Sequence, residues 1–404
     1  MNRRSPAGEG RPFTAFLIAG EVSGDILGAD LIVALRDRLV GRLRVVGVGG
    51  ERMIGAGLEV ALPMVAAGIH GFSAVLARLP SLVVAIRRTA AAVIAADPDV
   101  LVLIDSPGFN LRVAKIVRRA NPSITIVDYV SPTVWAYFPW RARLMTRHVD
   151  HVLAILPFEP AVHRDLGGPP CTYVGHPLRQ HLDALRPERG ERAPLTATGR
   201  PVLLVLPGSR PGEIARLMEP FGETLALVEE RFGAVEPILP AVAWLADDIR
   251  RRAAAWPVAP RIVDGEAAKL AAFRRAHAAL AASGTVTLEL ALAGVPMVVA
   301  YRVEPLTRPF KFLMRAGSIV LPNLIVDANV VPEFIDRDSS PERLAEALLP
   351  LLEASPERAR QLAAFDRVAD LLALAEGTPS SRAAEMVVET VRWRRLDAAL
   401  ERKN

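Results

Sequence analysis

The chain has 404 residues, about two to three average domains, of which 51% are hydrophobic and 23% are charged. This balance excludes a disordered or low-complexity chain. The single cysteine, Cys171, excludes a disulfide framework and a multi-cysteine metal site. The formal net charge of +5 suits anionic lipid or a phosphorylated substrate, or it reflects only a preference for Arg over Lys. Nucleic acid is not expected, because aromatic residues make up only 5% and no basic run is interleaved with them.

Short apolar runs alternate with amphipathic segments through the first half of the chain. Continuous Val, Ile and Leu runs joined by helices of about 10–20 residues are typical of a parallel sheet covered on both faces. The predicted strands are Phe13–Ala19, Leu43–Val48, Val100–Ile104, Ile124–Val130, Val152–Leu156 and Cys171–Val174. Predicted helices between them include Asp25–Leu39 and Ser81–Ala96.

The same alternation returns in the second half of the chain. The predicted strands there are Val202–Leu206, Val235–Leu239, Arg261–Val263, Ala278–Ala281 and Met297–Tyr301, and only helix is predicted after Ser340. We therefore predict an α/β protein with two doubly wound, Rossmann-like domains that face a cleft. The predicted parts are a first domain at 12–180, a linker at 181–200, a second domain at 201–370 and C-terminal helices at 371–404 that pack back on the first domain. Ligands of such sheets bind at the carboxyl ends of the strands.

Two motifs follow strands of the first domain. The stretch 19–25 (AGEVSGD) joins a strand to a helix, and its glycines are not spaced as in a dinucleotide fingerprint. A ligand can approach the backbone of such a turn, or Ser23 and Asp25 only cap the helix. In the second motif, 104–110 (IDSPGFN), Asp105 ends an apolar strand. It is either a general base, worth roughly 10²–10⁴ in rate, or a residue that holds the turn.

Two further motifs follow strands of the second domain. In 206–210 (LPGSR), Gly208 and Ser209 offer N–H groups to a phosphate and Arg210 adds a bidentate fork, unless it is a plain surface residue. The Lys of a P-loop is absent, so a diphosphate leaving group fits better than triphosphate hydrolysis. In 282–289 (ASGTVTLE), Glu289 lies one turn into the predicted helix. Its carboxylate either binds two ribose hydroxyls or is a solvated helix residue.

Other polar residues follow strands or occupy loops, each with a structural alternative. These are Asn323 in a loop expected over the cleft, Ser131 in 131–135 (SPTVW), and His176, for which a structural histidine is favoured. The sequence has no HExxH, no paired Asp-x-Asp and no spaced His/Cys set, so neither a metal nor another cofactor is expected.

The stretch 60–77 carries no formal charge over 18 residues, the lower limit for a membrane-spanning helix. Its proline and glycines make a continuous helix unfavourable. Two other interpretations stay open, a buried loop and helix or a surface element that dips into lipid. The side chains expected to face lipid are Val65, Ile69, Phe72, Val75, Leu76 and Leu79. The basic and apolar stretch 308–315 is either a second such patch or ordinary core.

Taken together, the motifs resemble one family, the lipid-A-disaccharide synthases, which are inverting glycosyltransferases of GT-B architecture. The resemblance spans roughly residues 14–340. The matching motifs, in chain order, are AGEVSGD (19–25), GVGGERM (47–53), IDSPGFN (104–110), YVSPTVWA (129–136), LPFE (156–159), VGHPL (174–178), LPGSR with Glu213 (206–213), ASGTVTLE (282–289) and LPN (321–323).

The resemblance implies that UDP-2,3-diacylglucosamine and 2,3-diacylglucosamine 1-phosphate (lipid X) react to the β-1,6-linked tetraacyl disaccharide 1-phosphate and UDP. It places the family's essential Asp and Arg on Asp105 and Arg210. Many relatives are acidic where this chain has Gly108, so Asp105 is the sole acid of its motif. The residues implied to bind UDP are Gly208, Ser209, Arg210, Ser283, Gly284, Thr285, Glu289 and Asn323. The acceptor-side candidates are Glu21, Ser23, Asp25, Asn110, Ser131 and His176.

These implications predict a cytoplasmic enzyme of a Gram-negative bacterium, attached peripherally to the anionic surface of the inner membrane, with homo-oligomerisation left open. Two rival functions are retained. One is an enzyme similar to UDP-N-acetylglucosamine 2-epimerases, which needs no sugar acceptor and no lipid-facing segment. The other is a non-catalytic UDP-sugar-binding protein, which does not need Asp105.

Overall fold

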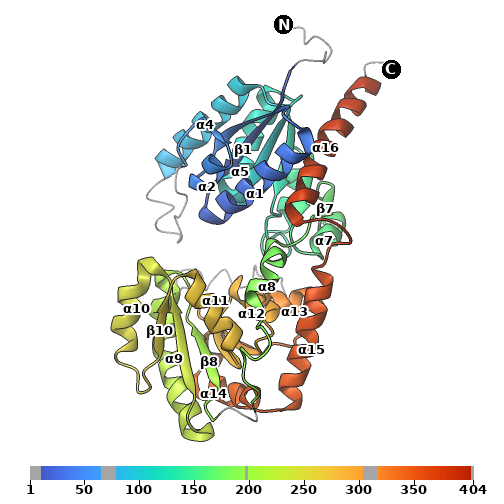
Figure 1. The fold of residues 1–404 in the computed structure, drawn as a ribbon. Coiled ribbons are helices and arrows are strands. Elements are labelled where there is room, and N and C mark those ends of the chain that lie inside the picture. Colours follow the sequence, from blue (N-terminus) through green and yellow to red (C-terminus); the bar gives the residue numbers. More distant parts are fainter. Residues whose placement is uncertain (1–10, 65–78, 196–198, 304–316, 402–404) are drawn as a thin grey trace. The chain divides into compact units, whose positions relative to one another are not determined.

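The computed structural model describes residues 11–64, 79–195, 199–303 and 317–401. The chain forms two compact units. Unit 1 contains Met1–Pro177 and Leu374–Asn404, and unit 2 contains Leu178–Ala373. Each unit is built around one parallel sheet with helices on its faces (Figure 1).

Unit 1 has a seven-stranded sheet in the order β3-β2-β1-β4-β5-β6-β7, and every strand pair is parallel. Its strands are β1 (Phe13–Ala19), β2 (Leu43–Val48), β3 (Glu59–Val60), β4 (Val100–Ile104), β5 (Thr125–Tyr129), β6 (His151–Ala154) and β7 (Cys171–Tyr173). Parallel neighbours need crossover connections, and here most of these connections contain helices. The helices are α1 (Val22–Leu39), α2 (Glu51–Gly55), α4 (Leu79–Ala96), α5 (Pro107–Ala120), α6 (Trp140–Met145), α7 (Glu159–Asp165) and α16 (Pro379–Glu401).

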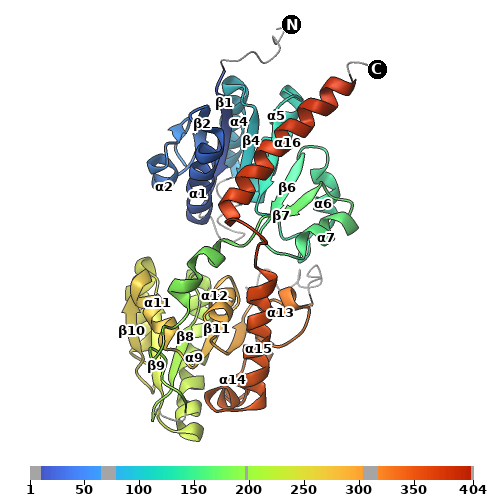
Figure 2. The ribbon, with the colours of Figure 1, turned by 45° about the vertical axis from the view of Figure 1, so that its right-hand side comes forward.

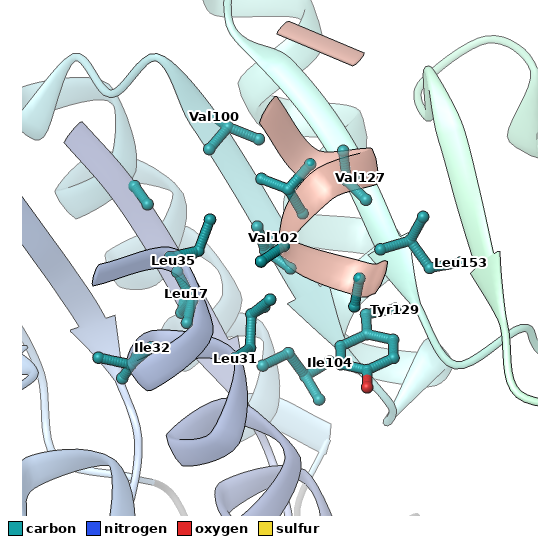
Figure 3. Close-up of a cluster of buried hydrophobic side chains, with 14 of the residues drawn as sticks. Leu17, Leu31, Ile32, Leu35, Val100, Val102, Ile104, Val127, Tyr129 and Leu153 are labelled. Carbon is teal, nitrogen blue, oxygen red and sulfur yellow. The ribbon is translucent and has the colours of Figure 1, made fainter. Parts of the chain in front are cut away.

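Alternation along the strands of unit 1 builds two cores, because successive side chains of a strand point to opposite faces. On β4, Val100, Val102 and Ile104 pack with side chains of α1 and α16, and Leu101 and Leu103 pack with those of α4 and α5. Figure 3 shows the first of these cores, in which the labelled leucines of α1 lie close to β1 and β4. Since both faces are covered, the strands read as unbroken apolar runs.

The C-terminal helix α16 belongs to unit 1 and runs along its sheet (Figure 2). Val387 and Val391 are buried there, and Arg395 forms an ion pair with Asp99 at 2.6 Å. The last part of the chain therefore helps to close the core of the first sheet.

Unit 2 has a six-stranded sheet in the order β10-β9-β8-β11-β12-β13, again with every pair parallel. Its strands are β8 (Val202–Leu206), β9 (Glu236–Ala241), β10 (Arg261–Asp264), β11 (Ala278–Ala282), β12 (Met297–Tyr301) and β13 (Glu333–Ile335). Its α-helices are α8 (Leu182–Leu185), α9 (Pro211–Phe232), α10 (Ala246–Ala253), α11 (Glu266–Arg275), α12 (Val286–Leu292), α13 (Leu321–Val326), α14 (Pro341–Leu348) and α15 (Pro356–Leu371). The core between its sheet and helices α9 and α14 includes Leu217, Phe221 and Leu344.

The predicted fold class is confirmed. The strands predicted at Phe13–Ala19, Leu43–Val48 and Val100–Ile104 coincide with β1, β2 and β4. Sequence reasoning missed β3 and β13, which are short edge strands without an apolar run. The stretch predicted as a linker, 181–200, contains α8 and lies within unit 2. Arg192 of this stretch donates to four carbonyls, including those of Gly294 at 2.7 Å and Ala293 at 2.9 Å.

No helix in the described ranges is both long and apolar enough to cross a bilayer. The residues predicted to face lipid fall at the edge of what the structure describes. Val65, Ile69, Phe72, Val75 and Leu76 lie outside the described residues, as does the stretch 308–315. Leu79 begins α4, but its side chain is not described.

Candidate functional site

The sheet of unit 1 changes direction between β1 and β4, and the two first-domain motifs follow these strands. The chain leaves β1 toward β2 on one side, and β4 pairs with β1 on the other. In register, Ala19 lies opposite Ile104, so Gly20 and Asp105 continue side by side at the carboxyl end of the sheet. Such a switch point is where open α/β sheets bind their ligands.

Asp105 sits in a turn with a strained backbone. Asp105 and Ser106 have φ angles of +55° and +46°, a region that residues other than glycine rarely adopt. The N–H of Ser106 donates to Oδ1 of Asp105 at 2.8 Å, and the hydroxyl of Ser23 donates to Oδ2 at 3.4 Å. The structure thus brings the two motifs together around one half-buried carboxylate. Strain of this kind persists where surrounding contacts impose it, and it gathers at functional sites.

Two neighbours hold this turn. Asn110 is fully buried, and its Nδ2 donates to the carbonyls of Asp105 at 2.7 Å and Ile104 at 3.2 Å. The N–H of Asp105 donates to the carbonyl of Tyr129 at 3.0 Å, next to Val130, whose φ is +79°. A β-branched residue at positive φ is a rare outlier, and no local sequence signal predicts it. Asn110 therefore fixes the backbone of the Asp105 turn through its two hydrogen bonds to the carbonyls of Ile104 and Asp105.

The remaining acidic candidates of the β1 turn have different surroundings. Asp25 is buried, and its carboxylate accepts from the N–H groups of Gly50 at 2.7 Å, Arg52 at 3.1 Å and Met53 at 3.1 Å. It therefore binds the first turn of α2, which explains the acid at this position by structure alone. Glu21 occupies the N-cap position of α1 and is half-buried, and its side chain makes no capping hydrogen bond.

Ser131, which follows β5, belongs to a polar cluster with Trp135 and with Glu159 and His163 of α7. Its hydroxyl lies 2.8 Å from Nε2 of His163, a fully buried side chain. Trp135 donates to Glu159 at 3.2 Å, and burial raises the pKa of that carboxyl to about 8. Burial lowers the pKa of His163 to about 4, and it lowers the pKa of the candidate His176, which follows β7, to about 4 as well. These histidines are neutral near pH 7, and the cluster is part of the interior.

In unit 2 the sheet changes direction between β8 and β11, and the two second-domain motifs follow these strands. After β8 the chain turns at Gly208 and Ser209 into α9, a helix of 22 residues whose N-cap is Arg210. The N-terminus of a helix carries free N–H groups and partial positive charge, which favours a bound anion. The side chain of Arg210 is 56% exposed, so its guanidinium is accessible.

Glu213 shapes this turn from inside. Its Oε2 accepts the N–H of Ser209 at 3.1 Å, and its Oε1 accepts from Arg210 at 3.2 Å. Gly208 has φ +113°, and a Cβ there would lie 2.4 Å from Oε2 of Glu213. Only glycine therefore fits over the buried carboxylate. The sequence motif included Glu213, but its role beneath the turn is visible only in three dimensions.

The turn after β11 presents Ser283, Gly284 and Thr285 before α12, and Gly284 and Thr285 are exposed. The hydroxyl of Ser283 donates to the carbonyl of Ile319 at 2.7 Å. Glu289 lies one turn into α12, and its Oε2 is 2.8 Å from Nζ of Lys269 on α11. Sequence reasoning missed Lys269, because α11 and α12 are brought together only by the fold.

Asn323 clamps the loop that carries Ile319. The amide of Asn323 is buried, donates to the carbonyl of Val331 at 2.9 Å, and accepts from the N–H groups of Val330 at 3.0 Å and Val331 at 2.9 Å. Glu333 accepts the N–H of Ile319 at 2.9 Å. The hydrogen bonds of the Asn323 side chain are thus made within the protein. Asn323 is linked to the Ser283 turn indirectly, through the loop whose Ile319 carbonyl accepts from Ser283.

Within the described parts of the chain, no three His, Cys, Asp or Glu side chains gather closely enough to hold a metal ion. The charged groups at the two switch points are a carboxylate in unit 1 and a guanidinium with a helix N-terminus in unit 2.

Solved structures of low sequence identity share the fold of this chain. A putative UDP-N-acetylglucosamine 2-epimerase from Listeria monocytogenes matches with a TM-score of 0.59 at 14% identity, over 94% of this chain and 96% of that one. MurG of Acinetobacter baumannii matches with a TM-score of 0.57 at 12% identity, over 94% of this chain and 100% of that one. The two parallel sheets and these neighbours define the class, an α/β protein of GT-B architecture.

Sequence relatives narrow this class to one family. The family profile described as lipid-A-disaccharide synthetase matches residues 15–387. A lipid-A-disaccharide synthase of Rhodopseudomonas palustris strain CGA009 is 52% identical over 94% of this chain and 96% of its own length. One from Rhodospirillum centenum is 41% identical over 94% and 95%. The chain belongs to the lipid-A-disaccharide synthase family, and it is a glycosyltransferase of lipid A biosynthesis.

Proposed function

We propose that this enzyme joins UDP-2,3-diacylglucosamine to the 6-hydroxyl of 2,3-diacylglucosamine 1-phosphate, with inversion at the anomeric carbon and release of UDP. One observation carries the assignment of roles. A strained, accessible carboxylate lies at the switch point of unit 1, and an exposed guanidinium on a long helix lies at that of unit 2. Inverting transfer needs these two kinds of group, a base for the acceptor and positive charge for the leaving diphosphate.

On the acceptor side, Asp105 takes the proton of the attacking 6-hydroxyl while the oxygen of that hydroxyl forms the new bond to the anomeric carbon. The hydrogen bonds from Ser106 and Ser23 orient the carboxylate, and Asn110 holds its backbone. Gly108 leaves Asp105 as the only acid of its motif. We therefore assign no second carboxylate to this step.

On the donor side, the breaking bond leaves its electron pair on the diphosphate of UDP. Arg210 and the N-terminal N–H groups of α9 stabilise that charge. Glu213 keeps the guanidinium and the Ser209 N–H on the same side of the turn, because it bonds to both. This arrangement is already in place before the reaction, which is the condition for electrostatic catalysis.

The nucleoside is assigned to the turn after β11. The carboxylate of Glu289 accepts hydrogen bonds from the two ribose hydroxyls, next to the exposed residues Gly284 and Thr285. Asn323 acts through the loop it holds, since its amide is occupied by Val330 and Val331.

Both sugar substrates carry acyl chains, so the protein must meet a membrane surface. We infer peripheral attachment to the cytoplasmic side of the inner membrane. Support comes from the uncharged stretch at 60–77 and from the net charge of +5, which favours anionic lipid. Exposed Val83 and Val84 on α4 extend the apolar character of this stretch into the described part of unit 1.

The direct test is to incubate the purified protein with both diacylated substrates, with and without EDTA, and to measure UDP and the disaccharide. We expect equimolar UDP and disaccharide in both conditions. Omitting the acceptor should abolish UDP release. Dependence on a metal would require a cation in the donor site and would contradict the assignment of charge stabilisation to Arg210 and α9.

The same assay separates the rival functions. Epimerisation of a UDP-sugar without accumulation of UDP would favour the epimerase, whose fold this chain shares. Binding of UDP-sugar without turnover would favour a non-catalytic protein. The sequence relatives support the transferase over both, because several of them match over nearly the whole chain at 50% identity or more.

A further inference from the structure

Unit 1 contains an apolar pocket of about 510 Å³ at the carboxyl end of its sheet. It lies on the α4 and α5 face, where Ile18 and the buried Thr89 form its floor and the exposed Val84 borders its mouth. Only three of its fourteen lining residues have a polar side chain. Pockets of roughly 300–1,000 Å³ accommodate small ligands, and apolar linings select apolar ones.

The pocket adjoins the carboxylate turn. Gly20 and Phe109 both line it. Gly20 follows Ala19, which pairs with Ile104, and Phe109 lies in the first turn of α5, four residues after Asp105. A ligand whose hydroxyl meets Asp105 therefore has its nearest apolar neighbour in this pocket.

We propose that this pocket holds one acyl chain of the acceptor lipid, which rests on the proposed function. The acceptor carries its acyl groups on the same sugar ring as the attacking hydroxyl, so a chain in the pocket anchors that ring beside Asp105. We assign the chain to the acceptor because the pocket adjoins the turn of Asp105, the residue assigned to the acceptor hydroxyl, whereas the turns assigned to UDP belong to unit 2.

The lining excludes other occupants. A sugar or nucleotide would bury hydroxyl or amide groups against side chains that cannot bond to them, which is unfavourable. Arg88, the single charged lining residue, is exposed and lies on the same helix as Val84. An acyl chain loses nothing by leaving water, and each methylene moved into an apolar site strengthens binding about fourfold.

The test fills the pocket. In the Ala85→Phe variant a ring replaces a methyl group that lines the pocket. The Ala91→Phe control makes the same replacement on α4 at an exposed residue outside the lining. Two measurements are made on both variants and the wild type. The first is kcat/KM with acceptors bearing long (about 12-carbon) and short (about 4-carbon) acyl groups, whose binding should differ by far more than tenfold. The second is direct binding of a fluorescent long-chain fatty acid.

We expect Ala85→Phe to lower kcat/KM for the long-chain acceptor at least tenfold and to weaken binding of the fatty acid similarly. Turnover of the short-chain acceptor should stay within twofold, which also shows that the variant is folded. Ala91→Phe should match the wild type in every measurement. Equal long-to-short ratios and equal fatty-acid binding in all three proteins would overturn the pocket assignment. Loss of fatty-acid binding in Ala85→Phe, with no turnover by the wild type, would support the pocket and reject the transferase instead.

Discussion

The ammonium of Lys269 lies 2.8 Å from Oε2 of Glu289, and the two side chains come from different helices, α11 and α12. Both are largely shielded, with exposed fractions of 24% and 17%. Burial alone would lower the pKa of Lys269, but the carboxylates of Glu289 and Glu266 outweigh it and raise the pKa. Lys269 therefore remains charged and holds Glu289 in the orientation assigned to the ribose.

Replacing Lys269 with Met should weaken UDP binding about tenfold, which corresponds to about 1.4 kcal/mol. The physical reason is that the carboxylate of Glu289 loses its partner and its fixed orientation. Isothermal titration with UDP measures the change. Lys115→Met is the matched control, since Lys115 is an exposed residue on α5 of unit 1.

The positioning role of Lys269 also predicts how its replacement combines with that of Glu289. In a Glu289→Ala background, Lys269→Met should cause no further loss of UDP affinity, because the two residues act as one unit. Additive losses would mean that Lys269 contacts the nucleotide by itself.

Arg210→Ala should reduce kcat by two orders of magnitude or more. Removal of one preorganised donor to a developing negative charge typically costs roughly 3–4 kcal/mol in the barrier. Steady-state kinetics with both substrates gives the number. Arg231→Ala, at the far end of α9, is the control and should retain normal turnover. Near-normal turnover of Arg210→Ala in a folded protein would remove this residue from the mechanism.

The positions of Asp105 and Arg210 illustrate what the sequence can predict. Each follows an unbroken apolar run and precedes a helix with Pro in its first turn, so both were expected at the carboxyl ends of parallel strands. Strand order is not encoded locally. That both residues lie at switch points follows only once β1 pairs with β4 and β8 pairs with β11.

Other roles depend on contacts between segments far apart in the chain. Asp25 looked like part of a ligand turn, but it binds the first turn of α2, 25 to 28 residues later. Asn323 was expected near UDP, and the structure shows its amide bonded to Val330 and Val331. A side-chain amide or carboxylate serves a ligand and a backbone equally well, and only tertiary structure shows which partner it has.

Asp105→Asn should lower kcat by roughly 10²–10⁴, the range for loss of a general base, with little change in affinity for UDP. Ser23→Ala should have a much smaller effect, because its hydrogen bond to Asp105 is long at 3.4 Å. Kinetics together with UDP titration separates the two effects. An equal loss of UDP affinity in Asp105→Asn would point to a folding defect, and unchanged kcat would exclude Asp105 as the base.

Membrane attachment is tested in the stretch outside the described residues. A triple replacement of Ile69, Phe72 and Leu76 with Ser should move protein from the membrane pellet to the soluble fraction, since apolar burial drives interfacial binding. Vesicle co-sedimentation with anionic and neutral lipid measures this directly. A matched replacement of exposed Val33 and Ile54, outside this stretch, should leave partitioning unchanged. Equal partitioning of the triple variant and the wild type would reject the assignment.

The pH dependence of stability provides the last prediction, which concerns His163 and its partner Ser131. Burial lowers the pKa of His163 from 6.5 to about 4, so between these values the unfolded chain binds a proton that the folded chain does not. Stability contributed by the neutral ring is therefore complete above pH 6.5 and is lost as the pH falls to 4, by up to about 3 kcal/mol. Glu159 acts in the opposite sense, because its raised pKa of about 8 makes stability fall as the pH rises from 4.5 to 8.

A difference between variants isolates the histidine from this opposing acid. His163→Gln keeps a group that can bond to Ser131 but removes the titration, and His181→Gln, an exposed histidine, is the control. Melting temperatures measured by calorimetry from pH 7 to pH 4.5 should fall less steeply for His163→Gln than for the wild type. The slope should not vanish, because His151 and His176 also have pKa values lowered to about 4 by burial. Parallel curves for the wild type and His163→Gln would mean that the ring is protonated inside the fold and finds an acidic partner there.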